Sequence, residues 1–412
     1  MLIRNGIGWL SSSSADITRA RGIIDSLRKP GVIDELGFLM LNSAFANRFY
    51  PGVTTIMTRA RYLIFIPAIY RHIEQSRNGV GRDVDKLSRD LQFDLRNALE
   101  KNEASFIGKE GRRALIRVPS TIYWGAFESL GIATRAMSES AYQRSLSEGT
   151  FGVAVAKDDD GNLHDEDDES LWDRSLKLSH VMDKGAFPAS TNFRLRKAEA
   201  QFLAERYGRL TADGEESLVT RLVDVGTSHG PESLQGLKYP WQVPGCSPVM
   251  SFELNQARLL SLFARGATLQ YYAMLLEKKR DEDSRLVAAF AAWWAEAKSD
   301  LASWDLSDFF SLVRRWGVGR GKLDEQFIGG WIQRAMAAKS ADALLKDGDA
   351  RRIIGLREDT VRRGKQRLKV KHQLESWRLP NNFSSTYYMD YRHGVGRQIA
   401  ADIVDGLLRG AV

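Results

Sequence analysis

Apolar side chains recur every three or four residues along most of this chain, which is the spacing of one face of an α-helix. The pattern is strongest over Phe252–Lys279, where Leu262, Leu269 and Leu276 fall on one face. There is no fixed-period repeat and no alternation of strands with helices. The pattern therefore predicts a mainly α, multidomain helical protein with few short strands.

Shorter stretches with the same spacing predict further helices. They lie at Asp34–Phe49, Val84–Leu99, Thr121–Leu130, Arg196–Arg206, Ser217–Val225, Leu286–Trp304, Phe309–Trp316, Phe327–Ala338 and Val395–Leu408. Another helix, capped by Thr54 or Thr55, is expected to contain Arg59 and Leu63. We expect Pro67 to bend or end that helix, because proline lacks the backbone N–H.

Residues 84–132 form the clearest compact unit in the sequence. The helical stripe at Val84–Leu99 is followed by a break, and the stretch Arg112–Val118 alternates weakly. A third segment then ends at Gly131. Three short elements with a glycine-bounded turn are compatible with a helix-turn-helix or winged-helix unit. Many small helical units have the same pattern, so the winged helix is one of several interpretations.

The net charge of +7 is unevenly distributed. Residues 1–156 carry +6, residues 157–173 carry −8, residues 174–345 carry +3 and residues 346–412 carry +6. These shifts predict a helical N-terminal domain, an acidic linker or loop, a helical domain and a basic C-terminal region, in that order. Within the acidic part, Lys157–Ser170 does not fit a calcium-binding loop, because Ala156 occupies the first ligand position. We interpret it as a solvated surface loop.

Motifs for catalysis and for cofactor binding are missing from the sequence. The chain has no P-loop, no dinucleotide-binding fingerprint and no metal-ligand spacing among its isolated histidines. The glycines of 317–322 (GVGRGK) have the wrong spacing for a phosphate loop, so we predict a connection between helices. Cys246 is the one cysteine, which excludes an intramolecular disulfide. We therefore expect no cofactor, no metal site and no catalytic residue.

The longest apolar stretch, Tyr62–Tyr70, is about nine residues long and contains Pro67. A bilayer span needs about 20 apolar residues, so this stretch predicts a buried core segment. The N-terminus lacks the apolar core of a signal peptide. We expect a cytoplasmic protein that has no membrane contact.

Basic residues are concentrated near the C-terminus. The run Arg351–Lys371 contains nine Lys and Arg against Glu358 and Asp359, a density that could neutralise nucleic-acid phosphates. The candidate nucleic-acid contacts are Arg59, Arg61, Arg112, Arg113, Arg351, Arg352, Arg362, Arg363, Lys365, Arg367 and Lys369. The run could instead contact a partner protein or form a plain solvated surface.

Arg59 and Arg61 have an alternative role beside the apolar segment. There they could pair with carboxylates such as Asp34 and Glu35. The aromatic string Tyr387–Arg392 is predicted to pack as a docking segment, with stacking on bases as the alternative.

Several strings resemble, in order, a family of bacterial proteins of unknown function. They are IGWLSSSSADITRA at Ile7–Ala20, FYPGVTTIMTRARYLIFIPAIY at Phe49–Tyr70, VPSTIYWGAFESLGI at Val118–Ile132, RKAEAQFLAERY at Arg196–Tyr207 and ARLLSLFARGATLQYYAMLLE at Ala257–Glu277. The resemblance implies a place beside helicases and phospholipase-D-like nucleases in prokaryotic antiviral defence regions. It brings no catalytic residues with it.

The basic clusters and this resemblance together favour one function. We expect a non-catalytic, nucleic-acid-binding subunit of an anti-phage defence complex, with DNA favoured and a helicase or nuclease as protein partner. Two alternatives stay open: a scaffold without nucleic-acid contact, and a metal-dependent nuclease whose site has no recognisable motif.

Overall fold

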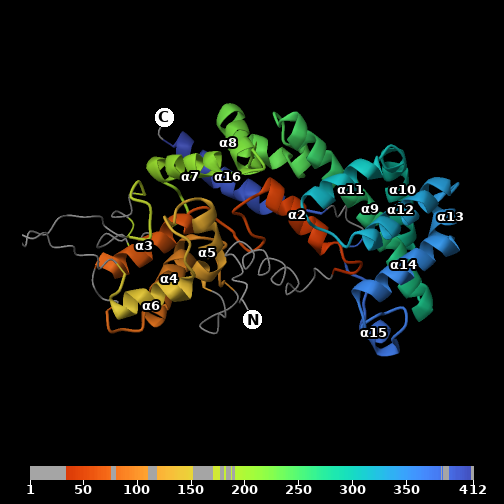
Figure 1. Cartoon of the computed structure of the whole chain (residues 1–412), viewed down its shortest axis with the longest axis horizontal. Coiled ribbons are helices and arrows are strands. Elements are labelled where there is room, and N and C mark those ends of the chain that lie inside the picture. Colours follow the sequence, from red (N-terminus) through yellow and green to blue (C-terminus); the bar gives the residue numbers. More distant parts are fainter. Residues whose placement is uncertain are drawn as a thin grey trace, which may run out of the picture. The chain divides into compact units, whose positions relative to one another are not determined.

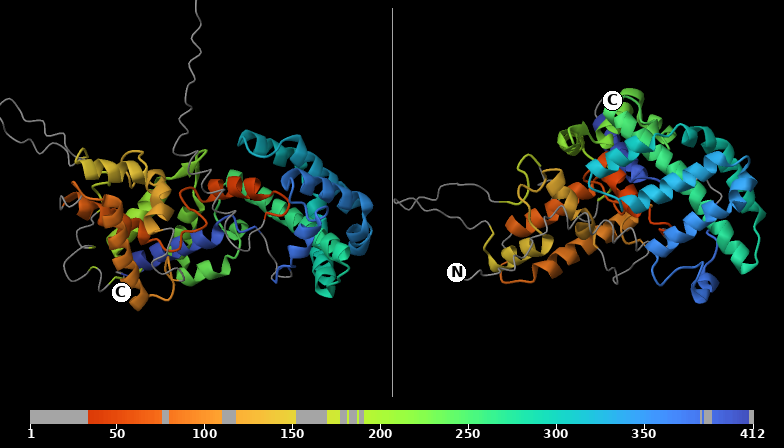
Figure 2. Two further views of the ribbon diagram at one scale, coloured as in Figure 1. Left: turned by 90° about the horizontal axis from the view of Figure 1, so that it is seen from below. Right: turned by 45° about the vertical axis from the view of Figure 1, so that its right-hand side comes forward.

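The computed structural model describes most of the chain (Figure 1). The described residues are 34–75, 80–109, 118–151, 170–176, 181, 187, 191–381, 383 and 389–409. They divide into two compact units, both mainly helical as predicted. The first unit takes residues from 49–238 and 392–409, and the second unit takes residues from 34–48 and 239–391. Figure 2 shows the helices of both units from two further directions.

The first unit is built from helices and one short hairpin. Its helices are α3 (Tyr62–Gln75), α4 (Val84–Asn102), α5 (Pro119–Ser129), α6 (Glu139–Glu148), α7 (Lys197–Arg209), α8 (Leu218–His229), η2 (Pro231–Gly236) and α16 (His393–Leu408). Strands β1 (Thr211–Ala212) and β2 (Glu215–Glu216) pair antiparallel, with Thr211 opposite Glu216. The turn between them is Asp213–Gly214, both at positive φ, as a tight hairpin turn requires.

Two packing centres hold the first unit together. Helix α3 is apolar on nearly every side and packs against α4 and α5. Helix α16 packs against α7 and α8, where glycines allow close approach. A Cβ on Gly226 would lie 2.7 Å from Val404, and one on Gly406 would lie 2.7 Å from Ala200. Both contacts are below the normal carbon separation, so only glycine fits at these crossings.

The second unit is a helical bundle. Its elements are α2 (Leu39–Phe49), η3 (Pro240–Gln242), α9 (Pro248–Lys279), α10 (Ser284–Ala302), α11 (Leu306–Arg315), α12 (Lys322–Ala337), α13 (Ala341–Lys346), α14 (Gly348–Val361) and α15 (Lys371–Ser376). Helix α9 runs through its core and is buried over most of its 32 residues. The side chain of Ser247 caps α9 by accepting from the backbone N–H of Met250, and Pro248 occupies the first turn, where its missing N–H costs nothing.

Buried tryptophans of α10 and α12 form hydrogen bonds to α9. The indole N–H of Trp293 donates to the Leu262 carbonyl at 2.8 Å, and that of Trp331 donates to the Gln270 side chain at 2.7 Å. The ring of Trp293 lies directly over Gly266, where a Cβ would come within 2.1 Å. These bonds matter because a buried indole N–H without a partner costs free energy.

Two predicted helix boundaries are wrong. Helix α2 begins at Leu39 rather than Asp34, whose carboxylate instead accepts the N–H groups of Phe38 and Leu39. The helix expected from Thr54 or Thr55 begins only at Tyr62. The preceding residues form turns and irregular backbone, and the N–H groups of Thr58, Arg59 and Ala60 bond to side chains from distant segments, as described below.

Pro67 does not end its helix. Helix α3 continues through it to Gln75. Tertiary packing overrides the local preference here, because the residues on both sides of the proline are buried.

Several sequence predictions fall partly or wholly outside the described residues. The acidic stretch 157–169 and residues 110–117 lie outside them, so the winged-helix interpretation of 84–132 stays a prediction. The predicted domain boundaries at 156, 173 and 345 also stay predictions. The glycines of 317–321 form the connection between α11 and α12, as expected.

The aromatic string near the C-terminus is described only in its second half, because Tyr387 and Tyr388 lie outside the described residues. The backbone N–H of Met389 donates to Ser261, and the Tyr391 hydroxyl donates to the Ala257 carbonyl. Both acceptors belong to α9, so this half packs as a docking segment.

Candidate nucleic-acid interface

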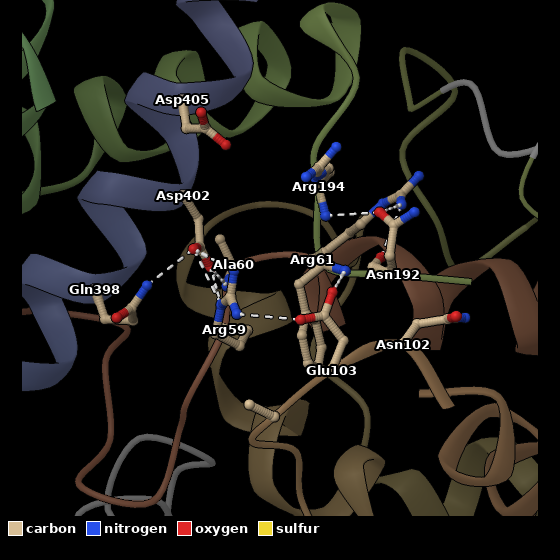
Figure 3. Close-up of polar contacts among 12 residues, drawn as sticks. Arg59, Ala60, Arg61, Asn102, Glu103, Asn192, Arg194, Gln398, Asp402 and Asp405 are labelled. Carbon is tan, nitrogen blue, oxygen red and sulfur yellow. Dashed lines mark hydrogen bonds and ion pairs between the residues drawn. The ribbon is translucent and has the colours of Figure 1, made fainter. Parts of the chain in front are cut away.

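Arg59 is held in a carboxylate network of the first unit (Figure 3). Its guanidinium contacts both oxygens of Asp402 at 3.0 Å and lies 3.9 Å from Glu103. Asp402 also accepts the backbone N–H of Ala60 at 2.8 Å and the side-chain amide of Gln398 at 3.0 Å. Burial raises the pKa of Asp402, and the bonds from Arg59 and Ala60 oppose that rise. Arg59 thus joins the loop before α3 to α16.

Arg61 is buried in the same region. It forms a bidentate ion pair with Glu199, with N–O distances of 3.0 and 3.1 Å. It also donates to the Asn192 carbonyl at 2.8 Å. Glu199 also accepts the backbone N–H of Arg196, which closes the first turn of α7. Breaking such a buried pair costs several kcal/mol, on the order of 3–5. The pairing expected for both arginines exists, but its partners are Asp402 and Glu199 rather than Asp34 and Glu35.

The string Phe49–Tyr70 is a structural junction of the first unit. The Tyr123 hydroxyl accepts the N–H groups of Thr58 and Arg59 at 2.9 and 3.1 Å and donates to the Arg59 carbonyl. Burial raises the pKa of Tyr123 to about 12, so this hydroxyl stays protonated at neutral pH. These bonds take the N–H groups of Thr58 and Arg59 away from helical hydrogen bonding, which explains the late start of α3.

The start of the string is fixed by a histidine of α16. The Tyr50 hydroxyl is hydrogen-bonded to Nδ1 of His393, whose Nε2 lies 2.8 Å from the Leu237 carbonyl. Because a carbonyl only accepts, Nε2 carries the hydrogen, and in the neutral ring Nδ1 accepts from Tyr50. A Cβ on Gly396 would lie 2.3 Å from the Tyr50 ring, so glycine makes room for it. The side chains of Tyr50, Arg59 and Arg61 in this motif are thus bonded within the protein.

Arg112 and Arg113 lie outside the described residues. The other candidates belong to the C-terminal run and lie in the second unit, on α14 and on the segment that follows it (Figure 1). Arg351 pairs with Glu277 of α9 at 2.8 Å and donates to the Leu345 carbonyl. Arg352 is exposed and lies 3.5 Å from Asp349.

Glu35 neutralises two arginines of the run. Its carboxylate is 4% exposed, pairs with Arg362 at 2.9 Å and also accepts from Arg367, which is buried. Burial raises the pKa of Glu35, and the hydrogen bond from Arg367 and the charges of Arg367 and Arg362 oppose that rise. A buried carboxylate between two guanidiniums is a structural clamp, and it fixes the segment 362–367 against the residues before α2.

Glu358 shapes the backbone of the same segment. This carboxylate is fully buried, and it accepts the N–H groups of Arg367 at 2.7 Å and Leu368 at 3.1 Å. It also accepts from the Tyr271 hydroxyl of α9 at 2.5 Å. Glu358 therefore holds residues 367–368 against the core of the second unit.

Between these two anchors, a tight turn presents Arg363 and Lys365 to solvent. The N–H of Lys365 donates to the Arg362 carbonyl at 2.7 Å, and Gly364 has φ +74°. Glycine at this position suits a turn that needs positive φ. Both basic side chains are exposed, and no described carboxylate lies within 4 Å of either one.

Further basic side chains surround the turn. Lys369 pairs with Asp359 at 2.5 Å, and Lys371 lies 3.8 Å from Glu375, with both lysines highly exposed. Lys278, at the end of α9, donates to the Leu368 carbonyl. Exposed pairs of this kind contribute about 0–1 kcal/mol, so these lysines can exchange a carboxylate for a phosphate at little cost.

The candidate residues thus differ in the free energy needed to break their ion pairs with carboxylates, which rises with burial. Arg61 and Arg367 are buried in carboxylate pairs, and Arg59, Arg351 and Arg362 are partly buried in pairs. Arg352 and Lys369 are exposed in weak pairs. Arg363 and Lys365 are the members of the described set that face solvent beside no described carboxylate.

Sequence reasoning missed the acidic residues that organise this surface. Glu35 was considered only as a partner for Arg59 and Arg61, and Glu358 only as a charge to be subtracted. Asp324 was not considered, although it pairs with the buried Arg357 at 2.7 Å. Isolated acidic residues beside apolar ones were the available signal, but sequence spacing does not reveal which residue each one contacts, whether the partner lies 33 residues away, as for Asp324 and Arg357, or 327 away, as for Glu35 and Arg362.

Other chemistry is limited within the described residues. No group of three or more His, Cys, Asp or Glu side chains is placed to hold a metal ion there. Cys246 is half-buried, and its thiol donates to the Val243 carbonyl at 3.4 Å. Across the same parts of the chain, no helix combines the length and the apolar character that a bilayer crossing needs.

Fold and surface together define a mainly helical protein with a basic turn held on buried carboxylates. The chain belongs to DUF6361, a family of unknown function whose model matches residues 5–406. No curated protein and no solved structure matches the chain.

Proposed function

We propose that this protein binds the phosphate backbone of nucleic acid, DNA above all, through the turn at Arg362–Lys365. The observation that carries the proposal is the exposure of Arg363 and Lys365 with no described carboxylate within 4 Å. A cation without a carboxylate partner breaks no ion pair in the protein when it binds a phosphate. The contact also releases counter-ions condensed on the nucleic acid, which favours binding.

The rigidity of the turn supports this function. Glu35 and Glu358 fix both ends of the segment, so the two cations are presented without a large ordering cost on binding. Lys371 and Arg352 add positive charge that is weakly paired with exposed carboxylates, and exposed Lys369 adds a charge paired with the half-buried Asp359. Such contacts are made with the phosphate backbone of the nucleic acid and not with its bases, so they predict binding without sequence preference.

The biological setting that we propose is a bacterial anti-phage defence complex. In it the protein would act as a non-catalytic subunit beside a helicase or nuclease. The support is the resemblance carried by strings such as Phe49–Tyr70, whose Arg59 and Arg61 side chains are bonded within the protein. A pull-down from the native host, with identification of the proteins and nucleic acid that associate, tests this setting.

Fluorescence anisotropy with labelled duplexes of unrelated sequence, at about 50 mM salt, tests the nucleic-acid function. The variant Arg363→Glu/Lys365→Glu should weaken binding about tenfold or more on every duplex, because each reversed charge repels a phosphate. The matched control is Lys86→Glu/Lys101→Glu on α4, which changes the net charge equally at exposed residues with no described carboxylate within 4 Å.

The control variant should bind like the wild type. Equal weakening by both variants would mean that only the net charge matters, and it would overturn the assignment to the turn. An absence of binding by the wild-type protein at low salt would overturn the nucleic-acid function itself.

A further inference from the structure

Helix α10 exposes a continuous apolar face. It packs against α9, α12 and α13 through its buried side, which includes Phe290 and Trp293 (Figure 1). The opposite side carries exposed Val287, Ala288, Ala291, Ala292 and Ala295, with Trp294 half-exposed at its edge. Val287 is 52% exposed. A solvent-facing helix side normally carries polar residues, so about two and a half turns without a polar side chain on this side point to a surface that is covered by another molecule.

The positions of these residues are symmetric about Ala291, and their sizes are complementary: a large residue on one side corresponds to a small one on the other. Val287 lies four residues before it and Ala295 four residues after it, while Ala288 lies three before and Trp294 three after. In an antiparallel pair of identical helices with a two-fold axis at Ala291, Val287 would face Ala295 of the second copy. Trp294 would face Ala288. Each large side chain would therefore meet a small one, which is the complementarity that close helix packing requires.

We propose that α10 is a self-association surface, on which a second copy of this chain docks its own α10 antiparallel about a two-fold axis at Ala291. The same patch then serves both copies, as a two-fold interface requires. This inference is independent of nucleic-acid binding, since it rests on a different face of the second unit.

The charges at the two ends of the face support a second copy as the occupant. Asp281 and Glu282 are exposed just before α10; with the adjacent exposed Arg280 they leave a net charge of −1, and no described cation lies within 4 Å of either carboxylate. Lys298 is exposed near its other end, where its ammonium lies over the Trp294 ring at 5.0 Å. The antiparallel arrangement brings Lys298 of each copy beside the acidic end of the other. A parallel arrangement would instead place like charges together.

A single pair of helices buries less area than a standard stable interface, so we expect a dissociation constant in the micromolar range. Sedimentation velocity of the full chain across about 1–200 μM should show a concentration-dependent shift from monomer to dimer. A monomer over the whole range would overturn the proposal, and so would a dimer that the α10 variants below leave unaffected.

Cysteine cross-linking tests the axis. In a Cys246→Ser background, Ala291→Cys should form an intermolecular disulfide under mild oxidation, because the residue on the axis faces its own copy. Ala288→Cys should not, since it would face Trp294 and lie about 9 Å along the helix from its own equivalent. Cross-linking of both variants would indicate a parallel pair and overturn the antiparallel arrangement. The absence of cross-linking in both would overturn the interface.

A charge exchange tests the ends of the face. Lys298→Glu alone and Glu282→Lys alone should each raise the dimer dissociation constant about fivefold or more, because each contact occurs twice. The double variant should restore the wild-type value. Circular dichroism establishes that all three remain folded, and a double variant as weak as the single ones would contradict the pairing.

Discussion

Burial distinguishes the basic side chains that hold the fold together from those that can contact a ligand. Arg367 and Arg362 belong to the same basic run as Arg363 and Lys365, yet the first two share the Glu35 carboxylate and the other two face solvent. Sequence reasoning identified the run and all of its basic members. It could not separate them, because the acidic partner lies more than 320 residues away in the chain.

The clamp at Glu35 gives a prediction about stability. Glu35→Ala should lower the free energy of unfolding by about 3–5 kcal/mol, because it leaves two partly or fully buried guanidiniums without a counter-charge. Urea denaturation monitored by circular dichroism measures the change. Glu205→Ala on α7 removes an exposed pair with Arg209 and should cost less than about 1 kcal/mol. Equal costs for the two variants would contradict the clamp.

Asp347 gives a prediction about pH. The hydrogen bond from Arg334 holds the pKa of Asp347 below its usual value of 3.8, and the carboxylate also caps α14 through the N–H of Ala350. The folded state therefore binds this proton more weakly than the unfolded chain does. The stabilisation is fully present above pH about 4 and is lost as the pH falls through the lowered pKa.

Asp347→Asn keeps a capping side chain and removes the charge. It should be less stable than the wild type by about 0.5–1 kcal/mol at pH 7, and the difference should shrink toward pH 3. Thermal unfolding at several pH values measures it. A difference that grows on acidification would contradict the sign. Asp342→Asn, which removes an exposed pair with Lys346 on α13, serves as the control at pH 7.

At the scale of elements, periodicity predicted where the helices lie better than where they start. Helices α4, α5, α9, α10 and α16 lie close to their predicted ranges. The start of α3 was missed because Tyr123 and Asp402, which bind the N–H groups of Arg59 and Ala60, come from other elements. Helices α6, α13, α14 and α15 were not predicted; α6, α13 and α15 have only six to ten residues, which carry little periodic signal, and α14 lies in a stretch that stands out in the sequence for its basic residues.

Helix α9 offers a test of packing against helix propensity. Gly266→Ala should destabilise the protein by about 1–3 kcal/mol, although alanine favours helices, because its Cβ would come within 2.1 Å of the Trp293 ring. Gly355→Ala on α14 meets no atom within 4 Å and should stabilise by up to about 1 kcal/mol. Denaturant titration compares the two, and a stabilising Gly266→Ala would contradict the close contact.

At the scale of the whole molecule, each unit is assembled from distant parts of the chain. Asp402 reaches Arg59 in the first unit, and Arg362 reaches Glu35 in the second. The net charge of a sequence segment does not show which residues form such pairs. Segment charges could therefore locate the basic regions but not the division of the chain into two units. Helical class was predictable because it depends on local spacing, whereas the assembly depends on long-range contacts.

The measurement that tests the basic turn most directly is the salt dependence of nucleic-acid affinity. Each phosphate contact contributes about −0.9 to the slope of log K against log salt. Wild-type protein titrated against a duplex at several salt concentrations should give a steep negative slope. Arg363→Glu/Lys365→Glu should flatten it by about 2, while Lys86→Glu/Lys101→Glu should leave it unchanged. An identical slope for wild type and the turn variant, or binding with no salt dependence, would contradict phosphate contact by Arg363 and Lys365.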